Sequence, residues 1–562
     1  MEQIKISGLN FTYPGSEEKT LADIDLSVRE GEFLLIFGRS GCGKTTFLKQ
    51  LKPVLAPFGK RSGTILFQGR EIGVLSEREQ SGKIGYVSQD PENQIVTDKV
   101  WHELAFGLES LGIDSGTIRI RVAEMASFFG IQNWFFRPVE DLSEGQKQIL
   151  NLASVMVMQP EVLLLDEPTS QLDPVAASRF IQMLRKINED LGVTVLISEH
   201  RLEEVLPVCT RVLYMEKGRI AADTDPGGIG EAMKKLRSGM SVALPACVRI
   251  CAEFENGKTP VTVRGARLWL KRRAGSGVRT LSGKTGPGTG RPKPKTESPA
   301  AALSDIWFRY DRKSEDVLRG VSLKIRRGAI TSILGGNGVG KSTLLSVLGG
   351  LLRPYRGKVE ILGRNLGQIV RGERYRGLLG CLPQDPRRLF RRSTVRQDLE
   401  DMASEVCRSG TAAEAALSRV IRFFCLGPLL DRHPFDLSGG ELECAALAKV
   451  LLTQPEILLL DEPTKGIDAV FKQKLAGLFS ALKREGKTIV LVSHDLDFCA
   501  SCSDDSALMF GGEILSENST RNFFIGNSFY TTSANRIARG IFPEALTSEE
   551  VIRACRENPA GD

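Results

Sequence analysis

One short loop pattern occurs twice in this chain, and it restricts the possible folds more than any other feature. FGRSGCGKTT begins at Phe37 and LGGNGVGKST begins at Leu334, and both fit G-x-x-x-x-G-K-[ST]. In this pattern glycines let backbone N–H groups surround phosphate oxygens, the lysine reaches the terminal phosphates, and the hydroxyl binds Mg²⁺. Each copy follows an apolar run (Phe33–Phe37 or Ile330–Leu334) and precedes a helix-like segment. Because a helix N-terminus favours anions, the pattern predicts two phosphate-binding loops.

The repeat extends far beyond these loops. The residues Gln89, Ser143, Asp166 and His200 recur at a nearly constant offset as Gln384, Ser438, Asp461 and His494, which indicates a duplicated domain. Each half also has an apolar strand that runs into an Asp-Glu pair, a β-rich strand that ends at the histidine, and a hairpin turned at Lys217-Gly218 or Gly511-Gly512. Strands that alternate with helical segments predict an α/β nucleotide-binding core in each half.

Length and composition limit the class of protein. A chain of 562 residues is too long for one hydrophobic core. No run approaches the roughly 18 apolar residues that span a bilayer, and Met1–Pro14 lacks a signal-peptide pattern. We therefore expect a cytoplasmic protein that needs a partner for any membrane role. The net charge of +7 is mild and usually reflects solubility alone.

Eleven scattered cysteines fit a reducing compartment. The C-x-x-C spacing of Cys499 and Cys502 could form a zinc site with Cys247 and Cys251, or these thiols could simply pack between helices.

The composition also divides the chain. Residues 271–300 are rich in Gly, Pro, Ser, Thr, Lys and Arg and cannot form a core, so we expect a linker that is either a solvated tether or a contact for nucleic acid or anionic lipid. We expect nucleotide-binding domains at 1–224 and 301–522, a helical extension at 225–270, and a C-terminal extension at 523–562.

Each half resembles the nucleotide-binding domain of ATP-binding cassette (ABC) proteins. The residues that carry the resemblance in the first half are Tyr13, Gly38–Thr45, Gln89, Leu142–Gln146, Asp166–Pro168, Asp173 and His200. In the second half they are Tyr310, Gly335–Ser342, Gln384, Leu437–Glu441, Asp461–Pro463, Asp468 and His494. The resemblance implies two tandem α/β P-loop domains that bind ATP and Mg²⁺ and hydrolyse ATP.

The resemblance also implies roles for individual residues. The catalytic residues would be Glu167 and Glu462, which polarise the attacking water, with His200 and His494 at the γ-phosphate. The metal would be held by Thr45, Gln89, Asp166, Ser342, Gln384 and Asp461. The first half would contact ATP through Tyr13, Gly38, Arg39, Ser40, Gly41, Cys42, Gly43, Lys44, Thr45, Thr46, Gln89, Ser143, Gly145 and Gln146. The second half would use Tyr310, Gly335, Gly336, Asn337, Gly338, Val339, Gly340, Lys341, Ser342, Thr343, Gln384, Ser438, Gly439, Gly440 and Glu441. Tyr13 and Tyr310 would stack on adenine or, as aromatic residues there often do, belong to the core.

In this family two cassettes pack head to tail, so each ATP lies between one phosphate loop and the signature of the other cassette. Ser438 would then cap the ATP on Lys44, and Ser143 would cap the ATP on Lys341. Glu144 replaces a usual glycine and would either repel the triphosphate or point outward. Because both glutamates and both histidines are present, we expect hydrolysis at both sites. Because each phosphate loop has a complementary signature in the same chain, we expect that no homodimer is needed.

The stretch QDPENQIVTDKVWHELAFGLESLG (Gln89–Gly112) resembles the ATPases of energy-coupling-factor importers and their cobalt and nickel relatives. This implies a peripheral protein on the cytoplasmic face of the membrane, which works with a transmembrane coupling subunit and a small substrate-binding membrane subunit. Within that segment Trp101 and Phe106 would grip the membrane partner or belong to the core. The second half lacks this aromatic run.

Two alternatives remain. A fused sugar-type importer ATPase would share the tandem cassettes, but its signature differs. A soluble two-cassette translation factor of the ribosome would usually carry Asn-His-Leu-Asp where Ser170–Asp173 and Lys465–Asp468 stand here. We expect no specific nucleic-acid partner.

Overall fold

The computed structural model describes residues 1–275, 277–279, 298–406 and 410–558. The chain forms two compact units, Met1–Ala266 and Arg267–Asp562, and each is considered by itself. Most of the linker expected at 271–300 and the last residues of the C-terminal extension lie outside the described residues.

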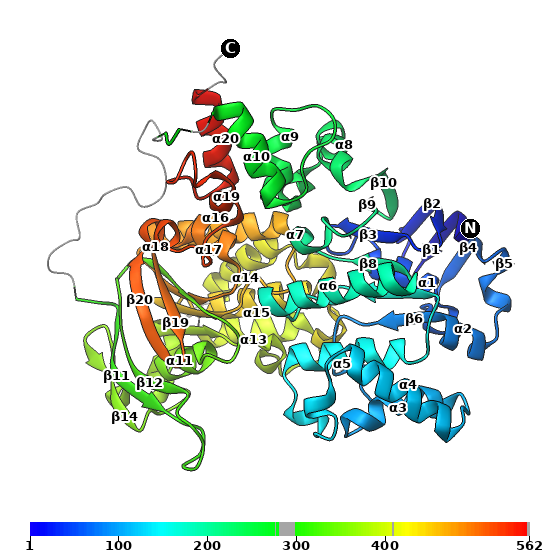
Figure 1. Ribbon diagram of the computed structural model, residues 1–562. Helices are drawn as coiled ribbons and strands as arrows, with labels where there is room; N and C mark the ends of the chain where they lie inside the picture. The colour runs from blue at the N-terminus through cyan, green and yellow to red at the C-terminus, as the bar shows by residue number, and fades with distance from the viewer. Residues whose placement is uncertain (276, 280–297, 407–409, 559–562) are drawn as a thin grey trace. The chain divides into compact units, whose positions relative to one another are not determined.

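The first unit contains two sheets (Figure 1). An antiparallel sheet has the order β2-β1-β4-β5, and a larger sheet has the order β10-β9-β3-β8-β7-β6. The strands are β1 (Glu2–Thr12), β2 (Leu21–Arg29), β3 (Phe33–Gly38), β4 (Lys60–Phe67), β5 (Arg70–Glu71), β6 (Ile84–Val87), β7 (Val162–Asp166), β8 (Thr194–Ser198), β9 (Arg211–Glu216) and β10 (Arg219–Thr224). The helices are α1 (Lys44–Gln50), α2 (Glu77–Lys83), α3 (Val100–Ser110), α4 (Ser115–Phe128), α5 (Glu144–Met156), α6 (Pro174–Leu191), α7 (Leu202–Val205), α8 (Ile229–Leu236), α9 (Ala246–Ala252) and α10 (Val263–Ala274).

The second unit repeats this plan. Its antiparallel sheet has the order β12-β11-β14-β15, and its larger sheet has the order β16-β17-β18-β13-β19-β20. The strands are β11 (Ala301–Phe308), β12 (Leu318–Ile325), β13 (Ile330–Leu334), β14 (Arg356–Ile361), β15 (Arg364–Asn365), β16 (Leu379–Leu382), β17 (Ile457–Asp461), β18 (Thr488–Val492), β19 (Asp505–Phe510) and β20 (Glu513–Ser519). The helices are α11 (Lys341–Leu348), α12 (Arg371–Glu373), α13 (Val395–Val406), α14 (Gly410–Phe424), α15 (Gly439–Leu452), α16 (Ala469–Arg484), α17 (Leu496–Cys502), α18 (Thr520–Gly526), α19 (Ser533–Ala538) and α20 (Ser548–Glu557).

The apolar runs of the sequence form the central parallel strands. β3, β7 and β8 are buried along their whole length, as expected for a parallel sheet that is covered on both faces. In the first unit, Phe47 and Leu48 of α1 belong to one core cluster with residues of both sheets, including Ile6 and Leu164. The hairpins expected at Lys217-Gly218 and Gly511-Gly512 are present as β9–β10 and β19–β20.

Parallel pairing places the functional segments together. β3 pairs with β8 and β8 pairs with β7, with Asp166 opposite Ser198. The carboxyl ends of these neighbouring strands therefore meet at one edge of the sheet. The loop before α1, the Asp166-Glu167 pair and His200 all follow these strand ends.

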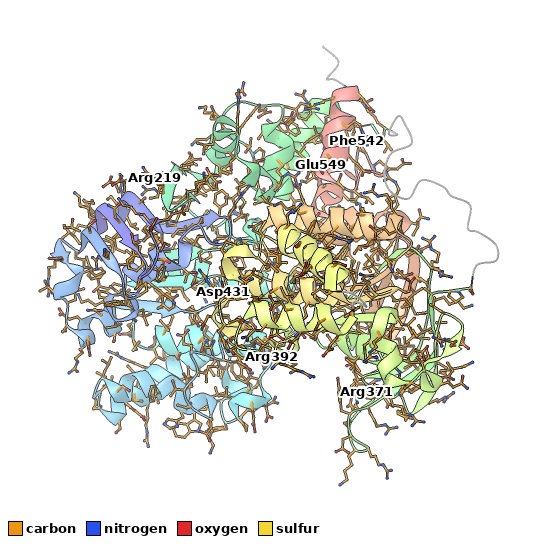
Figure 2. The ribbon with its side chains drawn as sticks, turned by 180° about the vertical axis from the view of Figure 1, so that it is seen from behind. Arg219, Arg371, Arg392, Asp431, Phe542 and Glu549 are labelled. Atoms are coloured by element: carbon orange, nitrogen blue, oxygen red, sulfur yellow. The ribbon has the colours of Figure 1, made fainter. Side chains whose placement is uncertain are left out.

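Short helices make up the two extensions. The boundary between the units falls inside α10, after Ala266. Within the second unit, the guanidinium of Arg267 in α10 donates to the carbonyl oxygen of Arg536 in α19 at 2.5 Å. Phe542, labelled in Figure 2, is fully buried in the C-terminal extension. Among the described residues, no helix has both the length and the apolar character needed to cross a membrane.

Candidate functional site

The first phosphate-loop candidate joins β3 to α1. Gly43 at the N-cap of α1 has φ 102°, and a Cβ atom there would lie 2.8 Å from the carbonyl oxygen of Thr20. Gly340 of the second loop has φ 101° and would clash in the same way with Val317, at 2.9 Å. Both the backbone conformation and the neighbouring carbonyl oxygen therefore require glycine at this point of each loop.

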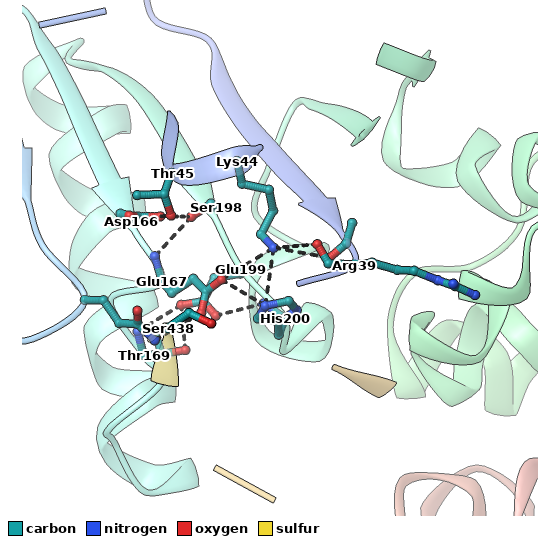
Figure 3. A network of polar contacts seen from close by, with 12 residues as sticks. Arg39, Lys44, Thr45, Asp166, Glu167, Thr169, Ser198, Glu199, His200 and Ser438 are labelled. Atoms are coloured by element: carbon teal, nitrogen blue, oxygen red, sulfur yellow. Dashed lines mark hydrogen bonds and ion pairs between the residues drawn. The ribbon is translucent and has the colours of Figure 1, made fainter. Parts of the chain in front are cut away.

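The lysine of the first loop lies at the centre of a polar network (Figure 3). Lys44 is only 4% exposed, and its Nζ donates to the carbonyl oxygens of Gly38 and Arg39 at 3.2 and 3.4 Å. The same Nζ lies 3.5 Å from Oε1 of Glu167 and 3.3 Å from Nε2 of His200. Residues far apart in the sequence thus meet around one buried ammonium group.

The second loop has the same construction. Lys341 is buried, and its Nζ donates to the carbonyl oxygens of Gly335 and Gly336 at 3.0 and 2.7 Å. Lys341 is also close enough to Glu462 to lower the pKa of that carboxyl group. Both units therefore place a lysine ammonium beside a glutamate at the end of the sheet.

Each of these glutamates pairs with a histidine. Oε1 of Glu167 lies 2.8 Å from Nε2 of His200, and Nε2 of Gln89 donates to its other oxygen at 3.3 Å. Burial opposes ionisation, but His200 and Lys44 outweigh it and lower the pKa of Glu167 to about 2. Glu167 also has φ 47°, an uncommon backbone conformation for a residue other than glycine.

The second glutamate repeats this geometry. Oε2 of Glu462 lies 2.8 Å from Nδ1 of His494, and the backbone N–H of His494 donates to the same oxygen at 3.3 Å. Glu462 has φ 52°. Burial again opposes ionisation, and His494 and Lys341 outweigh it, so the pKa of Glu462 is lowered.

The neighbouring aspartates distinguish the two units. Oδ1 of Asp166 accepts from Thr45 Oγ1 at 3.1 Å and from Ser198 Oγ at 2.8 Å, and Tyr86 donates to Oδ2 at 3.3 Å. Burial raises the pKa of Asp166, and the nearby Glu167 adds to the rise. Hydroxyl groups therefore satisfy both oxygens of this buried carboxyl group.

Asp461 has fewer partners. Ser342 donates a hydrogen bond to it, whereas its buried Oδ1 has no hydrogen-bond partner among the described residues. Cys381 and Val492 occupy the places of Tyr86 and Ser198. Burial raises the pKa of Asp461 to about 6.

The hydroxyl and carboxylate oxygens near each lysine loop are suitable ligands for a divalent cation. Each unit places a hydroxyl group (Thr45 or Ser342) against a buried aspartate (Asp166 or Asp461) beside the lysine loop. Carboxylate and hydroxyl oxygens are ligands of the kind that Mg²⁺ prefers. The buried Oδ1 of Asp461 is an atom that such an ion would satisfy.

Two tyrosines border the loops. Tyr13 and Tyr310 are 38% and 66% exposed, and each hydroxyl lies 3.0 Å from the threonine that follows the loop, Thr46 or Thr343. Their rings are therefore partly exposed beside the loop rather than enclosed in a core. This placement is compatible with an adenine-stacking role, which remains a prediction.

The signature motifs begin helices α5 and α15. Ser143 and Gln146 form a reciprocal capping box, and Ser438 forms the same box with Glu441, which satisfies N–H groups at each helix start. Each serine hydroxyl accepts a hydrogen bond from a backbone N–H of its own helix. The carboxylate of Glu144 lies 3.9 Å from Nζ of Lys147, so its charge is partly balanced within α5.

Sequence reasoning missed Glu199, which positions part of the first network. It is buried and accepts from the backbone N–H and the hydroxyl of Thr169 at 2.9 and 2.7 Å. Its other oxygen accepts from the backbone N–H of His200 at 3.2 Å. The corresponding residue of the second half is Ser493. Comparing the halves position by position could have drawn attention to this difference.

Other expected residues have less defined settings. Gln384 follows β16 and is exposed. The thiol of Cys42 lies in the core of the first unit, and burial raises its pKa although Lys44 opposes the rise. Among the described residues, no group of three or more His, Cys, Asp and Glu side chains is arranged to hold a metal ion.

Taken together, the strand ends, lysine loops, buried carboxylates and histidines define a nucleotide-hydrolysing P-loop protein with the site built twice. The family model described as "ABC transporter" matches residues 21–170 and 318–465. A Bacillus cereus protein named as an ABC transporter ATP-binding protein is 41% identical over 98% of each chain. A Streptomyces coelicolor protein of the same description is 32% identical over 98% of this chain and 99% of its own.

Among solved structures, cbiO1 of Clostridium perfringens, described as part of the ABC transporter complex cbiONQ, is 30% identical. The match covers 43% of this chain and 93% of that one, with a TM-score of 0.38. The family match and the full-length relatives show that this chain belongs to the ABC transporter ATP-binding family and contains two cassettes. It is an ATPase of that family.

Proposed function

We propose that this chain is the ATP-hydrolysing energy-coupling subunit of a membrane importer of the energy-coupling-factor or cobalt and nickel type. The proposal rests on the segment Gln89–Gly112 of the first unit, which resembles that group of ATPases in sequence. ABC membership alone does not distinguish importer types, so this segment carries the finer assignment.

The geometry of this segment suits a coupling role. At one end, Gln89 donates to Glu167 of the lysine network at 3.3 Å. At the other end, Trp101 and Phe106 are 37% and 39% exposed on α3. Buried Glu103 of α3 accepts from the backbone N–H groups of Val96 and Thr97 and so holds the preceding loop against α3. A partner that binds α3 could therefore alter the position of Gln89.

In this proposal both ATP sites form within one chain. Ser438, Gly439 and Gly440 cap the ATP held by Lys44, while Ser143 and Gly145 cap the ATP held by Lys341. The backbone N–H groups at the starts of α5 and α15 are suited to phosphate oxygens. Because each loop has a complementary signature in the same polypeptide, no homodimer is needed.

The residues of each site divide the reaction between them. Lys44 and Lys341 neutralise the β- and γ-phosphates, and Mg²⁺ bound by Thr45, Gln89 and Asp166, or by Ser342, Gln384 and Asp461, would balance the remaining phosphate charge. Glu167 and Glu462 orient the attacking water as carboxylates, and the lowered pKa of each keeps it ionised at neutral pH.

The partners follow from this function. They are a transmembrane coupling subunit and a small substrate-binding membrane subunit, with this chain bound peripherally at the cytoplasmic face. The small membrane subunit recognises the transported substrate, so the sequence of this chain does not identify that substrate.

Affinity purification of the tagged full-length chain from detergent-solubilised membranes tests the proposal. We expect an integral membrane subunit to purify in stoichiometric amount, together with a small second membrane protein, and MgATP hydrolysis by the complex. Recovery with ribosomal subunits and without membrane proteins would contradict the importer function and favour the translation-factor alternative.

A further inference from the structure

The loop that follows Gln89 in the first unit has a counterpart of opposite charge in the second. Residues 90–99 of the first unit read DPENQIVTDK, and residues 385–394 of the second read DPRRLFRRST. The first stretch has three acidic residues and one lysine, whereas the second has four arginines and one aspartate. We call the second stretch the arginine loop. The two loops therefore suit partners of different charge.

The backbones of the two loops are held in the same way. In the second unit, buried Asp398 accepts from the backbone N–H groups of Arg391 and Arg392, the latter at 2.9 Å. Lys449 completes this arrangement, because its Nζ contacts Asp398 and also donates to the carbonyl oxygen of Leu389 at 2.6 Å. Glu103 holds the corresponding first loop. The two loops thus share one backbone arrangement but carry side chains of opposite charge.

The four arginine side chains of the arginine loop are exposed, and three of them contact an aspartate. Asp385 accepts from Nε of Arg387 at 2.9 Å and lies 3.6 Å from Nε of Arg388. Nε of Arg392 donates to Asp401 at 2.5 Å. Within the residues that the structure describes, the exposed guanidinium of Arg391 has no hydrogen bond or ion pair.

The adjacent helix shows the same change of chemistry. Trp101 and Phe106 of α3 correspond to Arg396 and Asp401 of α13. Arg396 pairs with Asp431 at 2.9 Å, so a charged face replaces the aromatic one. Figure 2 labels Asp431 and Arg392 on this part of the second unit, and Arg371 belongs to a different element, α12.

From this arrangement we infer that the arginine loop binds a carboxylate-bearing cytoplasmic segment of the membrane coupling subunit. The inference rests on the proposed function and names the chemistry of the second contact. Arginine presents N–H groups in a planar fork that matches a carboxylate. Because the loop begins directly after Gln384, a segment bound here adjoins the second catalytic site.

An anionic membrane surface fits the loop less well. Attraction to lipid headgroups depends on an excess of several basic residues. Here Asp385, Asp401 and Asp431 lie among the arginines and neutralise much of their charge. Paired side chains with a small net charge favour a directional partner such as a peptide carboxylate.

Photocrosslinking in cells tests the inference with the full chain. A benzoylphenylalanine probe replaces Ser393 in the arginine loop, and a matched probe replaces Asp98, which occupies the same exposed position in the first loop. We expect the Ser393 probe to label an integral membrane subunit in a segment that contains Asp or Glu. We also expect Arg391→Glu with Arg392→Glu to reduce this labelling about tenfold or more, because attraction becomes repulsion.

Controls separate charge recognition from a folding defect. Arg391→Lys with Arg392→Lys should retain part of the labelling, since charge remains while the planar fork is lost. Arg371→Glu should leave labelling unchanged. Each variant should keep the thermal midpoint and the MgATP affinity of the unchanged chain, which shows that both cassettes are intact.

The remaining outcomes contradict the inference in distinguishable ways. Labelling of a segment without carboxylates, or labelling that is insensitive to charge reversal, overturns it. Lipid adducts, together with Arg391-dependent flotation on phosphatidylglycerol vesicles but not phosphatidylcholine vesicles, would assign the loop to the membrane surface. A membrane subunit labelled by the Asp98 probe alone refutes this inference only, whereas labelling by neither probe contradicts the proposed function as well.

Discussion

Oε1 of Glu167 lies 2.8 Å from Nε2 of His200, and Glu462 lies equally close to Nδ1 of His494. In both units this pairing holds a buried carboxylate in its ionised form beside a lysine of the phosphate loop. A carboxylate that remains ionised at neutral pH can accept a hydrogen bond from water and orient it. We therefore propose that the duplicated pairing supports hydrolysis at both sites.

Removing the hydroxyl group beside Asp166 should lower the stability of the first unit, whereas adding one beside Asp461 should raise the stability of the second. Ser198→Ala removes a donor to buried Asp166 and should lower the stability of the Mg²⁺-free first unit by about 1–3 kcal/mol. Val492→Thr places a hydroxyl next to Asp461, whose Oδ1 is buried without a partner among the described residues, and should raise stability by about 1 kcal/mol. Calorimetry in EDTA measures both effects. Ser198→Thr, which keeps the hydroxyl, is the control, and equal losses from both substitutions would refute the difference between the sites.

Lys52 should give the first unit a pH-dependent stability. Burial lowers the pKa of Lys52 to about 8, and its Nζ donates to the carbonyl oxygen of Ile84 at 2.7 Å. The folded protein therefore binds fewer protons than the unfolded protein between pH 8 and 10.5. The resulting penalty is fully present below pH 8 and disappears toward pH 10.5, a change of about 3 kcal/mol.

Lys52→Met provides the comparison. The stability of the unchanged chain relative to this variant should rise between pH 8 and pH 10, as measured by denaturant unfolding at several pH values. A difference that is constant over this range would mean that Lys52 titrates normally in the folded protein.

The exposed aromatic face of α3 should serve the membrane partner rather than the ATP sites. Replacing Trp101 and Phe106 by Glu should abolish co-purification of the membrane subunit, because charge is introduced into an apolar contact. ATP hydrolysis by the isolated chain should change by less than about twofold, as is usual for surface substitutions that leave the fold intact. A parallel loss of ATPase activity or of thermal stability would instead place these rings in the structural core.

Cysteine reactivity should follow burial. Cys42 and the loop lysine are neighbours, but burial raises the pKa of the thiol and disfavours the reactive thiolate. Maleimide should therefore modify exposed Cys425 well before Cys42, with or without MgATP. Peptide mapping checks the order, and rapid labelling of Cys42 that MgATP prevents would show that the thiol faces the nucleotide.

Sequence motifs predicted the residues of each lysine network because a parallel sheet collects the strand ends that bear them. Lys44 and His200 follow β3 and β8, and Asp166 is the last residue of β7, which pairs with β8. Their side chains therefore lie near one edge of the sheet. The hydrogen bonds from Tyr86 and Ser198 to Asp166 were not predictable, because they depend on side-chain direction at strand ends.

The sequence repeat did not predict every property of the second half. Gln384 matches Gln89 in the sequence, yet the two loops that follow expose opposite charges. A repeated motif predicts a repeated framework, as Glu103 and Asp398 illustrate by holding equivalent backbones. It does not predict the side chains that the framework exposes, because these are not required for folding.

The most direct measurement is single-turnover ATP hydrolysis by the chain with Glu167→Gln and Glu462→Gln. Glutamine keeps the size of each side chain but removes the carboxylate that orients water. We expect the rate to fall by ~10²–10⁴, while MgATP binds with nearly unchanged affinity because the lysines and loop N–H groups remain. Hydrolysis at the normal rate by this double variant would contradict the assignment of these two glutamates as the catalytic residues.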